Sequence, residues 1–158
     1  MSKRLANAGV ALTVLPSTDL FLMGRHHKHD HNVTRGVVPT HKLIHHGVNC
    51  ALSSNNVLNP FTPFGDCSLM RMANLYANIA QVGKRTDMGA CFDMITRRPA
   101  QIMRLKDYGV AVGNSADLVV LDATEPEMAV AELVPVLYAF KRGRRTFTRT
   151  PAELHRPK

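Results

Sequence analysis

A cluster of polar side chains directly follows a short apolar run near the middle of the sequence. Val48, Cys50 and Leu52 alternate as in a β-strand, and Ser53-Ser54-Asn55-Asn56 comes immediately after them. Two prolines and a glycine then mark a loop, VLNPFTPFG, at 57–65. This pattern predicts a buried strand that carries polar side chains at its carboxyl end, followed by a rigid loop that can close over a ligand. In α/β barrels, catalytic groups lie at this end of the strands.

A second candidate for chemistry is the histidine-rich segment RHHKHDHNVTRG at 25–36. Imidazole is the commonest metal-binding side chain. However, the spacing of the histidines matches no closed zinc site, and no predicted helix fixes it. We interpret the segment as a polar loop and leave a substrate-facing role open for His29 or His31. Three further histidines are expected on the solvated side of a short helix over 39–46, namely His41, His45 and His46.

Periodicity predicts the elements that must position these side chains. Leu12 to Pro16 is a continuous apolar run, typical of a parallel strand buried on both faces. Its carboxyl end carries Ser17-Thr18-Asp19. Apolar residues recur at helical spacing over 68–82, and either Asp66 or Ser68 can cap the start of this helix. Other helices are expected at 3–9, 87–96 and 99–105.

The chain changes character after Val110. The stretch 113–122, GNSADLVVLD, predicts a turn that leads into an apolar strand, in which Asp117 bonds nearby backbone. The ranges 134–140 and 145–148 predict a β-hairpin around Arg142-Gly143. Residues 151–158 are expected to form a disordered tail.

Length, charge and cysteine usage narrow the possibilities. The 158 residues suffice for one domain with a core, but a complete (β/α)8 barrel needs about 250. The net charge of +8 is dispersed and accompanies no nucleic-acid-binding motif, so a solvated basic surface is favoured over nucleic acid bound at the arginine-rich hairpin. No apolar run is long enough to cross a membrane. Three cysteines without CxxC spacing indicate reduced thiols and a cytoplasmic location.

The chain resembles the C-terminal part of cytosine deaminase and its relatives in the amidohydrolase superfamily. The last barrel strand of such enzymes reads like G-H-D-D-V-F-D-P-W followed by a Pro-Leu-Gly turn, where residues 53–61 here read SSNNVLNPF and 63–65 read PFG. Every acidic residue of that motif is an amide in this chain. The stretch 113–122 is similar to the G-x-x-A-D-L-V-V-L-D signature of amidohydrolases, and Gly24-Arg25 is similar to a pair that follows the seventh barrel strand.

The resemblance, from about Leu5 to Phe147, implies an α/β fold. The expected architecture is the C-terminal part of a TIM-like (β/α)8 metal-dependent hydrolase barrel, with its last two βα units plus helices, and half of a small β-sandwich. Residues 1–109 would form the partial barrel, 110–150 the C-terminal strands of the composite sandwich, and 151–158 the tail. A partial barrel exposes strand edges and apolar helix faces. Self-association, or pairing with a complementary barrel fragment, is therefore expected.

The resemblance also implies an activity. The family hydrolyses non-peptide C–N bonds of cyclic amides or amidines such as cytosine, and uses a divalent metal, zinc or iron. Asn55 stands at the position of the family's metal-binding, proton-transferring aspartate. An amide oxygen is a weak metal ligand, and because it carries no charge and accepts no proton it cannot act as a general base. The residues expected to contact a small heterocyclic substrate are Ser54, Asn56, Asn59 and Phe61, the last by stacking on the ring.

Two interpretations of the whole chain follow from these substitutions. The first is a cytosine deaminase-like hydrolase whose chain is truncated, lacks most metal ligands and is inactive by itself. The alternative is a catalytically inactive remnant or a binding module that pairs with another chain.

Overall fold

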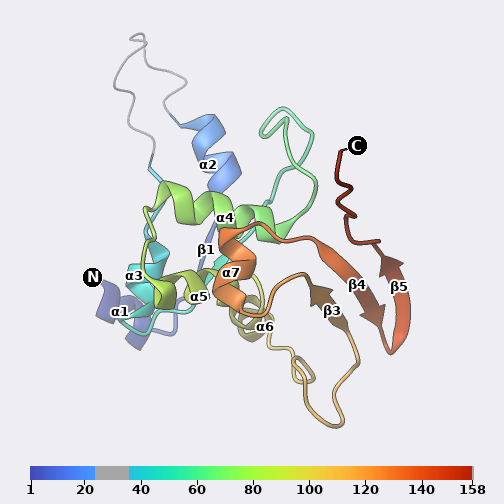
Figure 1. Ribbon diagram of the computed structural model, residues 1–158. Coiled ribbons are helices and arrows are strands. Elements are labelled where there is room, and N and C mark those ends of the chain that lie inside the picture. The colour runs from blue at the N-terminus through green and yellow to red at the C-terminus, as the bar shows by residue number, and fades with distance from the viewer. Residues whose placement is uncertain (24–35, 158) are drawn as a thin grey trace.

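Two short parallel strands form the centre of the protein (Figure 1). The computed structural model describes residues 1–23 and 36–157. Strand β1 (Leu12–Val14) lies beside β2 (Cys50–Leu52), with Leu12 opposite Cys50 and Val14 opposite Leu52. The prediction that the two apolar runs are adjacent parallel strands is confirmed, although both strands are shorter than expected.

The segment after β1 is a helix, although the sequence predicted that the strand continues to Pro16. Helix α2 (Pro16–Leu22) begins at the proline with which the strand was expected to end. Proline favours the first helical positions because its fixed φ is already helical and its missing N–H has no partner there. Thr18 therefore lies within a helix instead of a loop at the strand end, and only 7% of it is exposed.

Helices cover β2, whose residues are all buried. On α4 (Leu69–Ile79) the buried residues recur at helical spacing, at Met72, Ala73, Tyr76 and Ala77. The predicted helices are confirmed with shifted ends, and the others have the bounds α1 (Ser2–Asn7), α3 (Thr40–Ile44), α5 (Arg85–Asp93) and α6 (Arg97–Ile102). Among the described residues, no helix combines the length and apolar character needed to span a membrane.

One helix was not predicted from the sequence. Helix α7 (Pro126–Ala131) packs against α4 and α5, where Asn74 Nδ2 donates to the carbonyl oxygen of Val130 at 2.8 Å. Arg85 also forms ion pairs with Glu125 and Glu127. The signal that could have predicted α7 is Pro126 followed by Glu127, because proline and acidic residues both favour a helix start.

A three-stranded antiparallel sheet follows the helices, in the order β3 (Leu118–Leu121), β4 (Val136–Lys141) and β5 (Arg144–Thr148). The predicted hairpin is confirmed, with positive φ at both turn residues, 50° at Arg142 and 74° at Gly143. Asp117 stabilises this turn, because its Oδ1 accepts from the Arg142 backbone N–H at 2.7 Å and its other oxygen pairs with Lys141. The Lys141 hydrogen bond and the Arg142 N–H lower the pKa of Asp117.

The prediction that His41 lies on the solvated side of its helix is wrong, because this side chain is buried. It is only 4% exposed, because α3 turns it toward the fully buried Tyr76 of α4. The tyrosine oxygen lies 2.7 Å from His41 Nδ1, and it accepts from the His41 backbone N–H at 3.0 Å and from the Thr40 hydroxyl at 3.1 Å. Since both accepted hydrogens come from other groups, the Tyr76 hydroxyl hydrogen is left to donate to Nδ1, which must then be unprotonated.

This arrangement predicts that unfolding is sensitive to acid. Burial lowers the pKa of His41 against an opposing effect of Asp87, while Lys42 and His45 lower it further. The unfolded chain, in which histidine titrates near 6.5, then binds the proton at a higher pH than the folded chain does. The contribution of His41 to the free energy of unfolding should be fully present above about pH 6.5 and should be lost as the pH drops below that value. Urea unfolding between about pH 7.5 and about pH 5.5 measures the slope, which His41→Gln should flatten and the control His46→Gln should leave unchanged.

Candidate functional site

Helix α2 and the loop 53–67 meet at the carboxyl ends of the two parallel strands. The backbone N–H of Ser53 donates to the Val14 carbonyl at 3.0 Å, so strand pairing continues up to the first residue of the polar cluster. In Figure 1 the loop and α2 project on the same side of α4. The predicted site residues Ser54, Asn55, Asn56, Asn59 and Phe61 therefore all lie on one loop at this end of the strands.

Asn55 is exposed and occupies the left-handed region of backbone space, with φ of 56°. The backbone N–H of Asn56 donates to the Ser54 carbonyl at 2.6 Å, which closes a tight turn around Asn55. Asparagine is among the few residues other than glycine that readily adopt this conformation. Within the described part of the chain, the Asn55 side chain makes no hydrogen bond, so its amide is available to solvent or to a ligand.

Asn59 organises the tip of the loop. Its Oδ1 accepts from two backbone N–H groups, those of Phe61 at 3.0 Å and Thr62 at 3.1 Å, and its Nδ2 donates to Asn56 Oδ1 at 3.1 Å. A backbone bridge between Asn59 and Thr62 closes the same turn. The Asn56 and Asn59 side chains thus stabilise the conformation of the loop.

Two threonines that the sequence did not single out as site residues connect this loop to α2. Thr18 Oγ1 lies 2.9 Å from Thr62 Oγ1 and accepts from Asn56 Nδ2 at 3.4 Å. The Thr62 side chain is fully buried, and its hydroxyl donates to the Phe61 carbonyl at 2.8 Å. Thr18 belongs to the polar run expected after the first strand and Thr62 to the predicted loop 57–65, but no pattern in the sequence marks either residue as buried or as the partner of the other.

The aromatic side chains of the loop differ in their surroundings. Phe61 is 59% exposed, so its ring has a free face. The Phe64 ring packs edge-on against Phe21 of α2, with ring centroids 5.9 Å apart and an interplanar angle of 82°. Phe64 is nevertheless 65% exposed, so both rings have room for a planar ligand, and Phe61 differs in having no ring contact with another side chain of the described residues.

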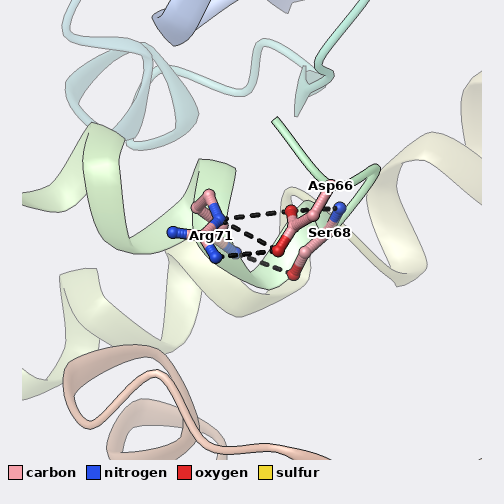
Figure 2. A network of polar contacts seen from close by, with 3 residues as sticks. All are labelled: Asp66, Ser68 and Arg71. Carbon is pink, nitrogen blue, oxygen red and sulfur yellow. Dashed lines mark hydrogen bonds and ion pairs between the residues drawn. The ribbon is translucent and has the colours of Figure 1, made fainter. Parts of the chain in front are cut away.

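Figure 2 shows how the far end of the loop is fixed to α4. Ser68 Oγ accepts from the Arg71 backbone N–H at 3.2 Å, so of the two predicted caps it is Ser68 that caps the helix. Asp66 Oδ1 accepts from the Ser68 N–H at 3.0 Å, and the Asp66 carboxylate pairs with the Arg71 guanidinium, 2.8 Å from Nη2. These bonds, that of Arg71 first, lower the pKa of Asp66. The loop is thus anchored at both ends.

The described residues do not form a metal centre. Residues 1–23 and 36–157 contain no group of three or more histidine, cysteine, aspartate or glutamate side chains arranged to hold a metal ion. The histidine-rich segment lies outside the described residues, and so do His26, His27, His29, His31 and the Gly24-Arg25 pair.

Comparison with known proteins gives consistent matches. A sequence profile described as "Amidohydrolase family" matches residues 1–147. An N-isopropylammelide isopropyl amidohydrolase of Pseudomonas sp. strain ADP is 31% identical over 112 residues, which are 70% of this chain and 28% of that protein. The chain thus spans little more than a quarter of this relative.

Solved structures show the same relationship. The structure of 5-methylcytosine deaminase from Klebsiella pneumoniae with 5-fluorocytosine is 27% identical, with a TM-score of 0.89 over 98% of this chain and 38% of that one. A second match is a variant of the atrazine chlorohydrolase TrzN from Arthrobacter aurescens TC1, complexed with zinc and atraton. It is 19% identical with a TM-score of 0.62, and the matched region covers 93% of this chain and 33% of the TrzN chain. This second likeness shows the fold, and it shows that a protein of this fold can be complexed with zinc.

Proposed function

Because the chain belongs to the amidohydrolase family, we propose that it forms one wall of a site that hydrolyses an exocyclic C–N bond of a nitrogen heterocycle. In such a reaction water supplies the oxygen that replaces an amino group, and ammonia leaves. The observation that carries the proposal is the position of the loop 53–67 at the carboxyl ends of β1 and β2. It is supported by the structural match to 5-methylcytosine deaminase, which covers 98% of this chain. The relatives include a 5-methylcytosine deaminase, a pterin deaminase and a 5-methylthioadenosine/S-adenosylhomocysteine deaminase, which makes an amino-substituted heterocycle the substrate class we assign.

We assign the contacts as follows. Phe61 stacks on the ring through its exposed face, and Ser54, Asn56 and Asn59 supply polar contacts at the ring edge. Asn55, at the position of the family's aspartate, lies on the same loop and offers an exposed, neutral amide. An amide cannot take a proton from water, so Asn55 and its neighbours on the described loop bind and orient the substrate but do not act as its general base.

The divalent metal that the family implies, zinc or iron, does not fit the described residues. A catalytic zinc site uses three protein ligands of the histidine, cysteine or carboxylate type. The described residues bring no such set together, and Asn55 contributes only an uncharged oxygen. We therefore assign no metal ligand to this part of the chain.

We further propose that β1 and β2 are the last two strands of a (β/α)8 barrel and that β3, β4 and β5 are half of a β-sandwich. Among the described residues, β1 has no strand on its other side, and Thr13 is exposed there. The apolar strand β3 is also exposed, with Val119 at 60%. Strand edges and apolar surfaces of this kind pair readily with other chains. Complementary barrel strands, or a second copy of this chain, would cover them.

A specific observation favours a second candidate, a binding module without catalysis. Asn55 replaces the residue that would transfer the proton, and the described residues form no metal cluster. The site would then bind a heterocycle without converting it.

The three cysteines are free, which agrees with the reducing cytoplasm that we propose as the location of either form.

The test is a titration of the full chain with 5-fluorocytosine, followed by 19F NMR and by the backbone amide signals of the loop. We expect the signals of Asn55, Asn56 and Phe61 to shift. We expect Phe61→Ala to weaken binding about two- to tenfold, because a lost aromatic contact costs about 0.5–1.5 kcal/mol. Leu58→Ala, an exposed residue of the same loop, is the matched control.

The outcomes separate the two candidates. Conversion to 5-fluorouracil with added zinc or iron establishes a hydrolase, and binding without conversion establishes a binding module in the isolated chain. Native mass spectrometry of the same sample shows whether the chain assembles with itself. No shift in the loop signals at saturating 5-fluorocytosine would overturn both candidates.

A further inference from the structure

The polar contacts between α2 and the loop 53–67 form a closed ring of hydrogen bonds. From Asn59 the ring passes to Asn56, then to Thr18 and Thr62, and reaches the loop backbone at Phe61. These four links measure 3.1, 3.4, 2.9 and 2.8 Å in that order, and the Phe61 N–H closes the ring by donating to Asn59 Oδ1 at 3.0 Å. The two threonines are buried, whereas the two asparagines are half-buried, so the ring connects the interior to the exposed face of the loop.

The direction of the two amide bonds in the ring is fixed by the backbone. Two backbone N–H groups point at one atom of the Asn59 amide, which must therefore be the oxygen. Its nitrogen then donates to Asn56, so Asn56 presents its oxygen to Asn59 and its nitrogen to Thr18. The Thr62 hydroxyl donates to the Phe61 carbonyl, and the single Thr18 hydroxyl hydrogen has two acceptors, Thr62 Oγ1 at 2.9 Å and the Ser54 carbonyl at 3.4 Å, of which Thr62 is the nearer.

This direction determines what the loop can offer a ligand. Each amide nitrogen carries two hydrogens and uses one of them in the ring. The second hydrogen of Asn56 Nδ2 and of Asn59 Nδ2 has no partner among residues 1–23 and 36–157. Two neighbouring N–H donors favour a ligand atom with lone pairs, such as a carbonyl oxygen or an unprotonated ring nitrogen.

We propose that Thr18 and Thr62 are positioning residues that hold Asn56 and Asn59 with their amide hydrogens toward the ligand. The ligand is then a heterocycle bound by its acceptor edge, as in the oxygen and ring nitrogen of a cytosine-type ring. This inference rests on the proposed function for the identity of the ligand. The ring itself rests only on the contacts of the described residues.

The experiment compares Thr18→Val, which keeps the side-chain shape and removes the hydroxyl, with Thr18→Ser, which keeps the hydroxyl. The first readout is amide hydrogen exchange at Phe61 and Thr62, together with the side-chain amide NMR signals of Asn56 and Asn59. We expect Thr18→Val to accelerate exchange and to weaken 5-fluorocytosine binding, each about tenfold, because loss of the hydrogen bonds of this hydroxyl has a net cost of about 1.4 kcal/mol. Thr18→Ser should stay within about twofold of the parent chain on the same scale.

The controls keep the test decisive. Thr13→Val removes an exposed hydroxyl that lies outside the ring and should change neither readout. If circular dichroism shows that Thr18→Val does not fold, the same comparison is made with Thr62→Val and Thr62→Ser. Unchanged exchange at Phe61 and Thr62 in the valine variant, or failure of the serine variant to restore it, overturns the inference. If the parent chain binds no 5-fluorocytosine while exchange responds as expected, the proposed function fails and the ring stands.

Discussion

Replacing Tyr76 with phenylalanine is expected to lower the free energy of unfolding by about 2–4 kcal/mol, the largest effect of any single hydroxyl in the described structure. The Tyr76 oxygen is the shared partner of His41 Nδ1, the His41 backbone N–H and the Thr40 hydroxyl. Phenylalanine fills the same space but leaves these buried groups without their partner. The Thr40 hydroxyl retains Met94 Sδ at 3.4 Å, whereas the two His41 groups have no such substitute in the described residues.

Urea unfolding of Tyr76→Phe measures this loss as a lower midpoint at unchanged slope. Tyr138→Phe is the matched control, because Tyr138 lies in β4 and its hydroxyl makes no hydrogen bond within the described residues. The control should change stability by no more than about 0.5 kcal/mol. Equal midpoints for the two variants would show that the hydroxyl of Tyr76 does not stabilise the fold.

Changing Asn56 and Asn59 to aspartate together should destabilise the protein far more than the sum of the single changes. In the native loop, Asn59 Nδ2 donates to Asn56 Oδ1 at 3.1 Å. Each single aspartate can still be satisfied. In Asn56→Asp the Asn59 amide already donates to the new carboxylate, and in Asn59→Asp the Asn56 amide can rotate to donate. Two carboxylates at this distance repel each other, and neither can donate. We expect a coupling free energy of about 1–3 kcal/mol near neutral pH.

A double-mutant cycle by urea unfolding measures this coupling directly. The close carboxylates raise the pKa of one of them above its value in the unfolded chain, so the penalty is present at neutral pH and disappears on acidification toward about pH 4. Asn55→Asp combined with Asn59→Asp is the control, since the Asn55 side chain lies outside the ring. Additive effects of Asn56→Asp and Asn59→Asp at neutral pH would contradict the hydrogen bond between them.

This coupling gives a physical meaning to the amides of the loop. The related motif carries acids where this chain has Asn55, Asn56 and Asn59. With amides at positions 56 and 59, the side chains can bond to each other, to the backbone and to Thr18 without any charge to neutralise. The same change removes the group that could accept a proton. In the function proposed above, this one set of substitutions would both leave the binding wall uncharged and remove the proton acceptor.

The sequence by itself determined the family and much of the local structure. Apolar runs predicted the strands β1 and β2, and the spacing of Met72, Ala73 and Tyr76 predicted α4. Arg142-Gly143 predicted the turn of the hairpin, because both residues adopt positive φ there. These features depend on residues close together in the chain, whose periodicity and backbone preferences can be read directly.

Only the tertiary structure decided how the polar side chains are used. Thr18 lies 44 positions from Thr62 and 38 from Asn56, and His41 lies 35 from Tyr76. No local pattern encodes such pairs, because a threonine or histidine has the same propensity whether its partner is water or a buried side chain. Packing brought α2 and α3 against the loop and α4, and burial then required each polar group to find a partner. For this reason the position of the loop could be predicted from the sequence, whereas its contacts with Thr18 of α2 became apparent only in the tertiary structure.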